Sequence, residues 1–255
     1  MISIGIDVGS VAAKGAAYNG KEIIKMAILP TGWSPKESGE ELLKNIMSDL
    51  NINRGDISTI VGTGYGRVSL PFVDKRITEI TCHGIGAYYV NSSIRTIIDI
   101  GGQDSKVIRI NEKGDVIDFL MNDKCAAGTG RFLQVMSNAL EVDIKDLSKL
   151  ASDTEPANIN SMCTVFAESE VVSLMAEGTS KEAIASGLLH SISNKTYSLV
   201  SRIGVENIVF FSGGVSKNKK IGEFLSKKLE VEIISSDESQ FLGAIGAAIA
   251  GYEHN

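Results

Sequence analysis

Two stretches of this chain repeat one short pattern, and each stands between two predicted strands. Residues 7–14 are Asp-Val-Gly-Ser-Val-Ala-Ala-Lys, and residues 99–106 are Asp-Ile-Gly-Gly-Gln-Asp-Ser-Lys. Both have an aspartate, a β-branched residue, a glycine, a small residue, three variable positions and a lysine, and 99 − 7 = 92 residues separate the aspartates. An internal repeat of this kind predicts two similar lobes. We expect them over residues 1–93 and 94–255.

Strands and helices alternate around both copies of the pattern. Apolar and β-branched runs predict strands at 2–8, 14–18, 22–29, 58–61, 95–100, 106–110, 116–121, 207–211 and 231–234. Apolar residues at helical spacing predict helices at 35–50, 82–90, 143–151, 164–176, 180–203, 217–229 and 243–250, with another beginning at Arg131. Asn19-Gly20 predicts a two-residue hairpin. The alternation places the chain in the α/β class.

Composition bounds the class of protein. A chain of 255 residues with 43% hydrophobic content can bury a large core. Its three cysteines form no Cys-x-x-Cys pair, and no charged-then-apolar leader opens it at Met1, so we expect a reducing cytoplasm. No apolar run approaches the ~20 residues that span a bilayer, which argues against a membrane protein. The net charge of −6, the scattered basic residues and a single Trp argue against nucleic acid as a partner.

Glycines mark the ends of several predicted strands. A strand-end aspartate followed by glycine and a small residue places a carboxylate beside exposed backbone N–H groups, which suits a metal-bound phosphate. Gly213-Gly214 forms a third strand-end turn. The chain lacks a Gly-x-x-x-x-Gly-Lys-Ser/Thr pattern, and no Gly-x-Gly-x-x-Gly follows its first strand. We therefore expect an ATP site of another architecture.

Two cysteines have matching surroundings. Cys125 precedes the predicted helix that begins at Arg131 by a few residues, and Cys163 directly precedes the helix predicted at 164–176. Partial positive charge at a helix start favours a thiolate, the form that binds metals. The alternative is that both cysteines are small buried apolar residues. If both are ligands, they would belong to a metal site.

Four segments resemble the signatures of the 2-hydroxyacyl-CoA dehydratase activators. These segments are residues 99–106, 122–132, 163–170 and 213–215. The activators belong with the BadF/BadG/BcrA/BcrD ATPase family, inside the superfamily of acetate and sugar kinases, heat-shock 70 proteins and actin. The resemblance implies two similar lobes of the actin/sugar-kinase (ribonuclease H-like) type with a nucleotide cleft between them.

The same resemblance implies a function and partners. It implies a homodimer with one [4Fe–4S] cluster at its interface, ATP or ADP with Mg²⁺, and delivery of a low-potential electron coupled to ATP hydrolysis. The acceptor would be a 2-hydroxyacyl-CoA dehydratase or a related double-cubane or benzoyl-CoA-type reductase. The donor would be a protein such as a ferredoxin or flavodoxin.

The resemblance also implies residue roles. The phosphate turns would contain Gly9, Ser10, Lys14, Gly101, Gly102 and Gln103. Asp7 and Asp99 would hold Mg²⁺ through water, with Asp99 or Gln103 orienting the attacking water. Gly213, Gly214 and Gln240 would contact the nucleoside, and Cys125 and Cys163 would bind the cluster. Cys82 is interpreted as structural, and the three histidines as packed or hydrogen-bonded. One departure is the apolar Val11-Ala12-Ala13, where the family often has hydroxyl residues.

Two alternatives remain open at this point. The first is a small-molecule kinase of the same superfamily, which would transfer phosphate rather than electrons. The second is a metal-free ATP-dependent regulatory protein in which Cys125 and Cys163 only pack.

Overall fold

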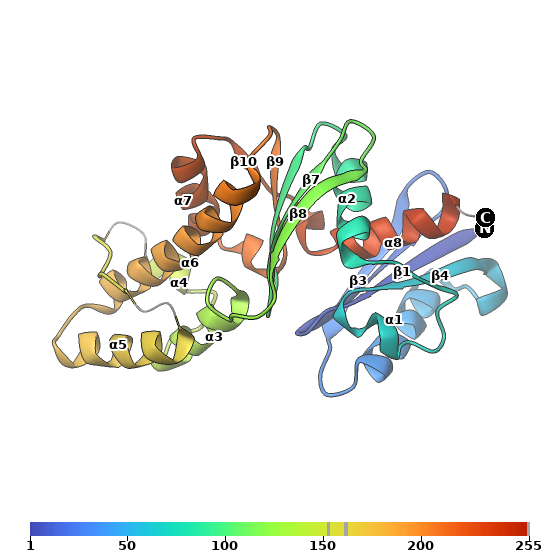
Figure 1. Cartoon of the computed structure of the whole chain (residues 1–255). Helices are drawn as coiled ribbons and strands as arrows, with labels where there is room; N and C mark the ends of the chain where they lie inside the picture. Colours follow the sequence, from blue (N-terminus) through green and yellow to red (C-terminus); the bar gives the residue numbers. More distant parts are fainter. Residues whose placement is uncertain (152–153, 161–162, 254–255) are drawn as a thin grey trace. The chain divides into compact units, whose positions relative to one another are not determined.

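The chain forms two compact units, shown in a computed structural model that describes residues 1–151, 154–160 and 163–253 (Figure 1). The first unit contains residues 1–97, 108–119 and 236–255, and the second contains residues 98–107 and 120–235. The units are interleaved along the chain. Residues 108–119 and 236–255 belong to the first unit, although they lie within the predicted second lobe. Consecutive lobes divided at residue 93 remain a prediction.

The first unit contains a five-stranded sheet in the order β3-β2-β1-β4-β5. Its strands are β1 (Ile2–Val8), β2 (Ala12–Tyr18), β3 (Ile23–Pro30), β4 (Ile57–Thr63) and β5 (Lys75–Arg76). Strands β1, β2 and β3 form an antiparallel meander, whereas β4 pairs parallel to β1 and β5 parallel to β4. The predicted hairpin between β2 and β3 is confirmed, but residues 19–22 connect the strands rather than a two-residue Asn19-Gly20 turn. Gly20 has a φ of 91°.

Helix α1 (Pro35–Leu50) packs on one face of this sheet. The Ser34 side chain accepts a hydrogen bond from the Glu37 N–H and caps the helix, with Pro35 in the first turn. The buried Leu42 and Ile46 contact the sheet where Gly15 leaves room for them, since a Cβ there would lie 2.4 Å from Ile46 Cδ1.

Helix α8 (Leu242–Glu253) approaches β1 unusually closely. A Cβ on Gly5 of β1 would lie 2.0 Å from the Ala244 carbonyl oxygen. Helix α8 also packs closely against α2 (Glu79–Val90). A Cβ added to Gly246 of α8 would lie 1.8 Å from the Cys82 carbonyl oxygen of α2. The glycines and alanines of the helix predicted at 243–250 thus permit this close packing.

The second sheet repeats the strand order of the first. Its order is β10-β9-β6-β7-β8, which read from the other end is β8-β7-β6-β9-β10. If β6–β10 are numbered 1–5 in chain order, both sheets have the order 3-2-1-4-5. The strands are β6 (Thr96–Ile100), β7 (Ser105–Ile110), β8 (Val116–Asn122), β9 (Val209–Ser212) and β10 (Ile233–Ile234). The internal repeat is thereby confirmed at the level of topology.

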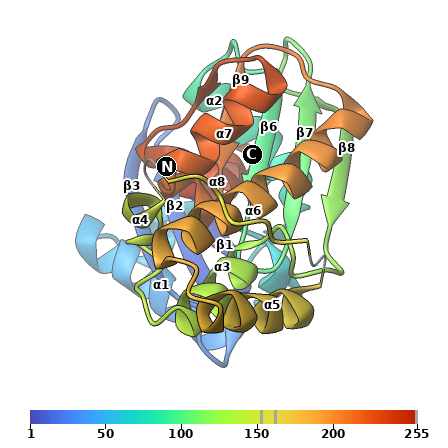
Figure 2. The ribbon, with the colours of Figure 1, turned by 90° about the vertical axis from the view of Figure 1, so that its left-hand side faces the viewer.

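The described residues of the second unit form the helices α3 (Gly130–Ala139), α4 (Leu147–Leu150), α5 (Thr164–Ala176), α6 (Lys181–Ile203) and α7 (Lys219–Leu229). Figures 1 and 2 show α3 beside α5 and α6 beside α7, and each pair is in contact. Apolar residues of these helices and of the strands form one buried core that includes Ile100, Phe132, Leu188 and Phe211. None of the helices in the described ranges is long and apolar enough to cross a membrane.

One helix is shorter than predicted. The predicted helix at 143–151 is helical only at Leu147–Leu150. The Asp143 side chain accepts a hydrogen bond from the Lys145 N–H and the Asp143 carbonyl accepts one from the Asp146 N–H. This local turn competes with helix formation, as short polar side chains commonly do.

Gly213 and Gly204 provide a matched test of backbone packing. Both have backbone angles that only glycine adopts readily, with φ, ψ of 85°, 175° and 81°, 168°. A Cβ at Gly213 would lie 2.2 Å from the Ile100 carbonyl oxygen, whereas one at Gly204 would have nothing within 4 Å. We expect Gly204→Ala to lower the free energy of unfolding by about 1–3 kcal/mol, and Gly213→Ala by about 2 kcal/mol more. Urea unfolding measures both, and equal losses would contradict the close approach.

Candidate functional site

Residues 7–14, called the first phosphate turn after their predicted role, join β1 to β2. Asp7 and Lys14 are directly opposite in the antiparallel register, and Lys14 Nζ lies 3.9 Å from Asp7 Oδ2. The Gly9 N–H donates to the Ala12 carbonyl at 3.1 Å and closes the turn. A Cβ on Gly9 would lie 3.2 Å from Lys14 Nζ, so the ammonium group sits beside the turn backbone. The structure therefore brings Asp7, Gly9 and Lys14 together.

Two glycines that the sequence analysis did not assign enclose the Asp7 carboxylate. A Cβ on Gly64 would lie 2.2 Å from Asp7 Oδ1, and one on Gly243 would lie 2.8 Å from Asp7 Oδ2. Gly64 also has a φ of 80°. No larger residue fits either position without moving the carboxylate. A glycine after the β4 strand was visible in the sequence, but its contact with β1 arises only from the tertiary fold.

Thr31 supports the first turn from the end of β3. Its Oγ1 donates to the Gly9 carbonyl at 2.7 Å and its N–H donates to the Val11 carbonyl at 3.0 Å. Thr31 is buried, whereas the Val11 side chain is exposed. A hydroxyl group thus contacts this turn from outside the apolar Val11-Ala12-Ala13 segment.

Residues 99–106, called the second phosphate turn after their predicted role, join β6 to β7 and are held by a buried charged network. Asp99 Oδ1 accepts a hydrogen bond from Ser212 Oγ at 2.5 Å, and Asp99 Oδ2 accepts one from Lys106 Nζ at 2.9 Å. Lys106 Nζ also donates to Asp104 Oδ2 at 2.7 Å. The side chains of Asp99 and Lys106 are 5% and 3% exposed. Both carboxylate oxygens of Asp99 therefore have partners, and the side chain joins β6, β7 and β9. Gln103, by contrast, is exposed in the turn.

The second turn also contacts the start of α3. The Gly130 N–H donates to the Gly101 carbonyl and the Arg131 N–H to the Gly102 carbonyl, each at 2.8 Å. The first amides of a helix have no partner within the helix. Here carbonyl groups of the second turn satisfy two of them, so these two amides face the turn and do not point to a bound anion.

The third glycine turn follows β9. Gly213 lies against β6, and Gly214 begins a 3₁₀ turn, η3 (Gly214–Lys217), in which Ser216 Oγ donates to the Gly213 carbonyl at 2.7 Å. Gln240 is half-buried in another 3₁₀ turn, η4 (Asp237–Gln240), which belongs to the first unit. Its predicted role beside Gly213-Gly214 remains a prediction.

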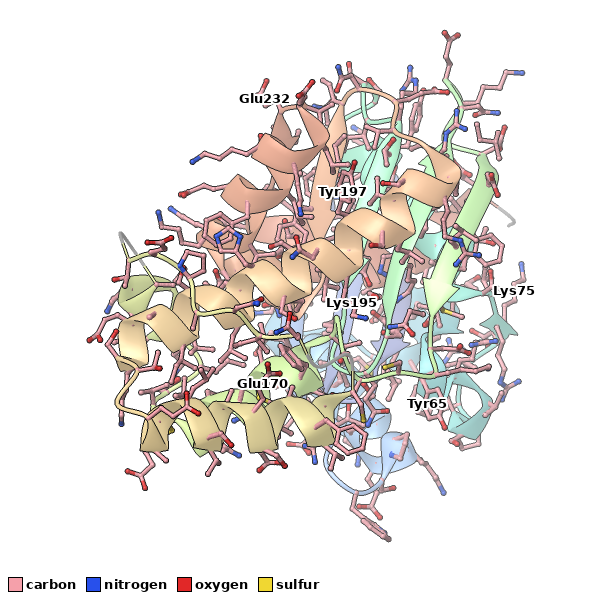
Figure 3. All side chains as sticks on the ribbon, turned by 60° about the vertical axis from the view of Figure 1, so that its left-hand side comes forward. Tyr65, Lys75, Glu170, Lys195, Tyr197 and Glu232 are labelled. Carbon is pink, nitrogen blue, oxygen red and sulfur yellow. The ribbon has the colours of Figure 1, made fainter. Side chains whose placement is uncertain are left out.

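Cys125 is exposed in the loop between β8 and α3. The Asn122 side chain holds this loop, since its Nδ2 donates to the Cys125 carbonyl at 2.9 Å and its Oδ1 accepts from the Cys125 N–H at 3.3 Å. Gly128, with a φ of 90°, packs against α6, where its Cβ would lie 3.2 Å from Lys195 Cβ. Lys195 is labelled on α6 in Figure 3. The loop therefore has a defined shape that presents the thiol to solvent.

Cys163 is the residue that caps the start of α5, and it is also exposed. Its carbonyl accepts from the Ala167 N–H at 2.9 Å. Glu170 of α5, labelled in Figure 3, accepts from the Asn160 N–H at 3.0 Å and ties the preceding segment to the helix. The predicted places of both cysteines ahead of helices are confirmed, and their exposure removes the alternative that they are buried.

Cys82 differs from the other two cysteines. It is fully buried in α2, and burial raises the pKa of its thiol to about 12. The neighbouring His83 is also buried, and its Nδ1 lies 2.7 Å from the Glu79 carbonyl oxygen. The interpretation of Cys82 and His83 as structural is supported. His254 lies outside the described residues.

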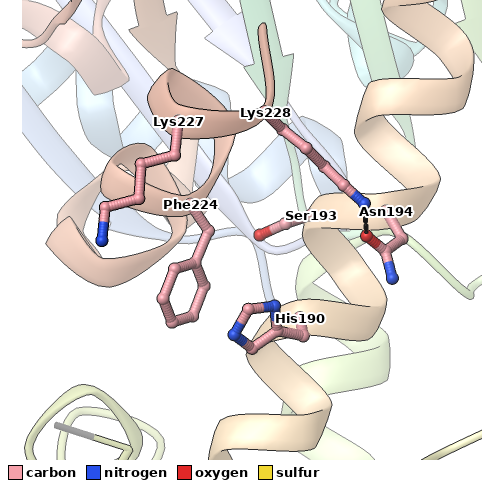
Figure 4. A pocket seen from close by; sticks show the side chains of 6 residues that line it. All are labelled: His190, Ser193, Asn194, Phe224, Lys227 and Lys228. Atoms are coloured by element: carbon pink, nitrogen blue, oxygen red, sulfur yellow. Dashed lines mark hydrogen bonds between the residues drawn. The ribbon is translucent and has the colours of Figure 1, made fainter. Parts of the chain in front are cut away.

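A separate hollow lies between α6 and α7 and contains none of the predicted site residues. Its volume is about 190 Å³, and it is lined by His190, Ser193, Asn194, Phe224, Lys227 and Lys228 (Figure 4). The His190 ring stacks on Phe224 with 4.0 Å between centroids. Burial and the charges of Lys228 and Lys227 lower the pKa of His190. His190 is therefore a packed residue, as the sequence analysis expected.

The donor set of one chain fits half of a four-thiolate cluster. Cys125 and Cys163 are exposed thiols, and thiolates are the usual ligands of iron–sulfur clusters. Among the residues that the structure describes, no three His, Cys, Asp or Glu side chains are grouped as a metal site. A four-thiolate cluster bound by these two cysteines would need two further ligands.

Thiol labelling checks the contrast between the cysteines. In reduced, metal-free native protein we expect iodoacetamide to label Cys125 and Cys163 and to leave Cys82 unmodified. Raising the pH from about 7 to about 9 stays below the Cys82 pKa of about 12, so its thiol remains protonated as well as buried. Mass spectrometry of the native and urea-unfolded protein counts the labels. Rapid native labelling of Cys82 would contradict its burial.

Comparison with known proteins identifies relatives over the whole chain. The (R)-2-hydroxyglutaryl-CoA dehydratase activating ATPase of Acidaminococcus fermentans is 43% identical, over 98% of this chain and 97% of the relative. The solved structure of the activator of the 2-hydroxyisocaproyl-CoA dehydratase from Clostridium difficile, with bound ADPNP, is 40% identical. It covers 100% of this chain and 95% of its own, with a TM-score of 0.94.

The fold extends to proteins of a different class. A ROK family glucokinase from Streptomyces griseus matches with a TM-score of 0.59 at 12% identity, over 99% of this chain and 100% of its own, which shows a shared fold alone. The predicted sugar-kinase type of α/β fold is confirmed. The sequence pattern of the BadF/BadG/BcrA/BcrD ATPase family matches residues 4–251, and the chain therefore belongs to this family.

Proposed function

We propose that this protein is an ATP-dependent activator that delivers a low-potential electron to a 2-hydroxyacyl-CoA dehydratase or a related reductase. The observation that carries this proposal is the pair of exposed cysteines in an ATPase of this family: Cys125 lies in the loop that precedes α3, and Cys163 lies at the N-terminus of α5. The names of the matched dehydratase activators support the class of partner. A ferredoxin or flavodoxin would supply the electron.

The proposed cofactor is one [4Fe–4S] cluster shared by a homodimer. Two exposed thiolates from each chain give the four ligands that such a cluster usually takes, and a two-fold axis would relate the two pairs. Helix α5 also carries exposed apolar side chains near Cys163, at Val165, Phe166 and Val172. Apolar groups beside the ligands suit a surface that is covered in the dimer. When bound, the cluster would supply the one-electron redox chemistry.

The proposed nucleotide contacts follow the geometry of the turns. Lys14 Nζ, beside the Gly9 backbone, would contact phosphate oxygens, with Ser10 in the same turn. Asp7 is enclosed by glycines and lies 3.9 Å from Lys14, so its carboxylate is the better candidate to hold the waters of Mg²⁺. Asp99 already has two short hydrogen bonds. We therefore assign Gln103, rather than Asp99, to orient the attacking water.

ATP would make the electron transfer effectively one-way. For a one-electron couple each 59 mV corresponds to about 1.4 kcal/mol, so a very reluctant acceptor requires a coupled source of free energy. Hydrolysis can supply that free energy only if the nucleotide-bound and nucleotide-free states differ at the electron-delivering surface. The phosphate turns and the segments that bear Cys125 and Cys163 are the parts that would have to differ.

Iron analysis after anaerobic purification tests the cluster. We expect about four irons and four sulfides per dimer, with a visible spectrum that bleaches with dithionite. Cys125→Ala and Cys163→Ala should each lose most of the iron. Cys82→Ala serves as the matched control because Cys82 is buried, and it should keep the iron while losing about 1–2 kcal/mol of unfolding free energy. Colourless wild-type protein that still hydrolyses ATP would contradict the proposal and favour a kinase or regulatory protein.

Substitution of Lys14 tests the nucleotide contact separately. Lys14→Met should raise the dissociation constant of ADP about tenfold, because the anionic nucleotide loses a charged donor worth roughly 1.4 kcal/mol. Lys21→Met, at an exposed lysine in the β2–β3 hairpin, removes the same charge as a control. Isothermal titration calorimetry measures both constants. Equal affinities in the two variants would show that Lys14 does not contact the nucleotide.

A further inference from the structure

The two phosphate turns share a backbone hydrogen bond but differ in the side chain three residues after the first glycine. In each turn the first glycine N–H donates to a carbonyl three residues later, from Gly9 to Ala12 at 3.1 Å and from Gly101 to Asp104 at 2.9 Å. Asp104 therefore occupies the position that Ala12 occupies in the first turn. Only the second of these turns has a carboxylate there.

Asp104 changes the environment of the repeated lysine. Lys14 lies 3.9 Å from Asp7 with its side chain 18% exposed, whereas Lys106 is 3% exposed and bonds both Asp99 and Asp104, at 2.9 and 2.7 Å. A buried ammonium group is costly unless carboxylates surround it. Lys106 is therefore held inside the second unit by two carboxylates, whereas the Lys14 side chain at the matching position of the first unit is partly exposed and pairs with Asp7.

Asp104 also touches the backbone of the turn. A Cβ on Gly101 would lie 2.5 Å from Asp104 Oδ1, so the carboxylate packs directly on the Gly101 backbone. The carbonyls of Gly101 and Gly102 in turn accept the first two amides of α3, from Gly130 and Arg131. A continuous set of short contacts thus runs from Lys106 through Asp104 and the turn to α3.

The start of α3 is joined to the Cys125 loop by a tight turn. The Thr129 N–H and Oγ1 both donate to the Ala126 carbonyl, at 3.0 and 2.6 Å, and Thr129 is fully buried. Cys125 is the residue directly before Ala126. A displacement of the Gly101 or Gly102 carbonyl would therefore act, through the start of α3 and this hydrogen-bonded turn, on the residue next to Cys125.

We infer that Asp104 and Lys106 are positioning residues that lock the second phosphate turn to α3, so that the turn and the Cys125 loop change state together. This inference rests on the proposed function, because it assigns the residues that link nucleotide state to the cysteine segment. Neither residue contacts the nucleotide in this mechanism. They set where the Gly101 and Gly102 carbonyls lie.

Asp104→Ala in the purified protein tests the lock. Residue-resolved hydrogen–deuterium exchange, with and without ADP, reports the amides of Gly130 and Arg131, and steady-state ATP hydrolysis reports kcat and KM. We expect both amides to exchange about tenfold faster and to lose their response to ADP. We also expect kcat to fall about fivefold with KM within about twofold, since binding is retained and positioning is lost. Exchange and kcat within about twofold of wild type would overturn the inference.

Two further variants separate positioning from general destabilisation. Asp115→Ala removes a carboxylate that bonds Asn111 in the β7–β8 turn, and it should leave Gly130, Arg131 and kcat unchanged. Asp104→Asn keeps an acceptor for Lys106 and should lie between wild type and Asp104→Ala. If Asp104→Ala does not fold, Asp104→Asn decides: faster exchange confined to the two amides supports the lock, and unchanged exchange overturns it.

The exchange measurement does not depend on iron or on a partner enzyme. Failure of the proposed function would appear as iron-free protein with the lock intact. Failure of the lock would appear as wild-type exchange rates at Gly130 and Arg131 in an Asp104→Ala variant that still contains iron.

Discussion

The buried pairing of Asp99 with Lys106 and Ser212 is the interaction on which the second unit depends. It joins β6, β7 and β9 at the edge where the second phosphate turn and the Gly213 turn begin. Ionised groups this deeply buried are tolerated only when each has a charged or hydrogen-bonding partner. The network therefore fixes three strand ends relative to one another. Those strand ends position the glycine turns. The turn after β6 then positions the first amides of α3 through the Gly101 and Gly102 carbonyls.

Close backbone approach has the corresponding role in the first unit. Gly5 of β1 and Gly246 of α8 leave no space for a side chain, and Gly64 and Gly243 enclose the Asp7 carboxylate. Packing at this distance is possible only for glycine, so these positions hold a strand and a helix together while keeping a carboxylate at the end of β1. The first turn consequently combines a rigid support with an accessible lysine, whereas the second combines a rigid support with a buried one.

Much of the fold was predictable because its signals are local. Most predicted strands and helices were placed within a few residues, since alternation, helical spacing and capping residues act over short stretches. The repeat of 7–14 at 99–106 predicted two equivalent strand series, which the two sheet orders confirm. The prediction of a helix over 143–151 was wrong for its first turn. The hydrogen bonds that Asp143 accepts in the local turn cannot be read from the spacing of apolar residues.

The sequence by itself determined the fold class, the repeated turns and two cysteines placed ahead of helices. It could not distinguish the two lysines of the repeat, because Lys14 and Lys106 occupy the same position in the pattern. Only the tertiary structure buried one between two carboxylates and left the other beside the turn backbone. It likewise exposed Cys125 and Cys163 and buried Cys82. The physical reason is that burial and charge pairing depend on residues distant in the chain, such as Ser212 beside Asp99, whereas strand and helix formation depends on near neighbours.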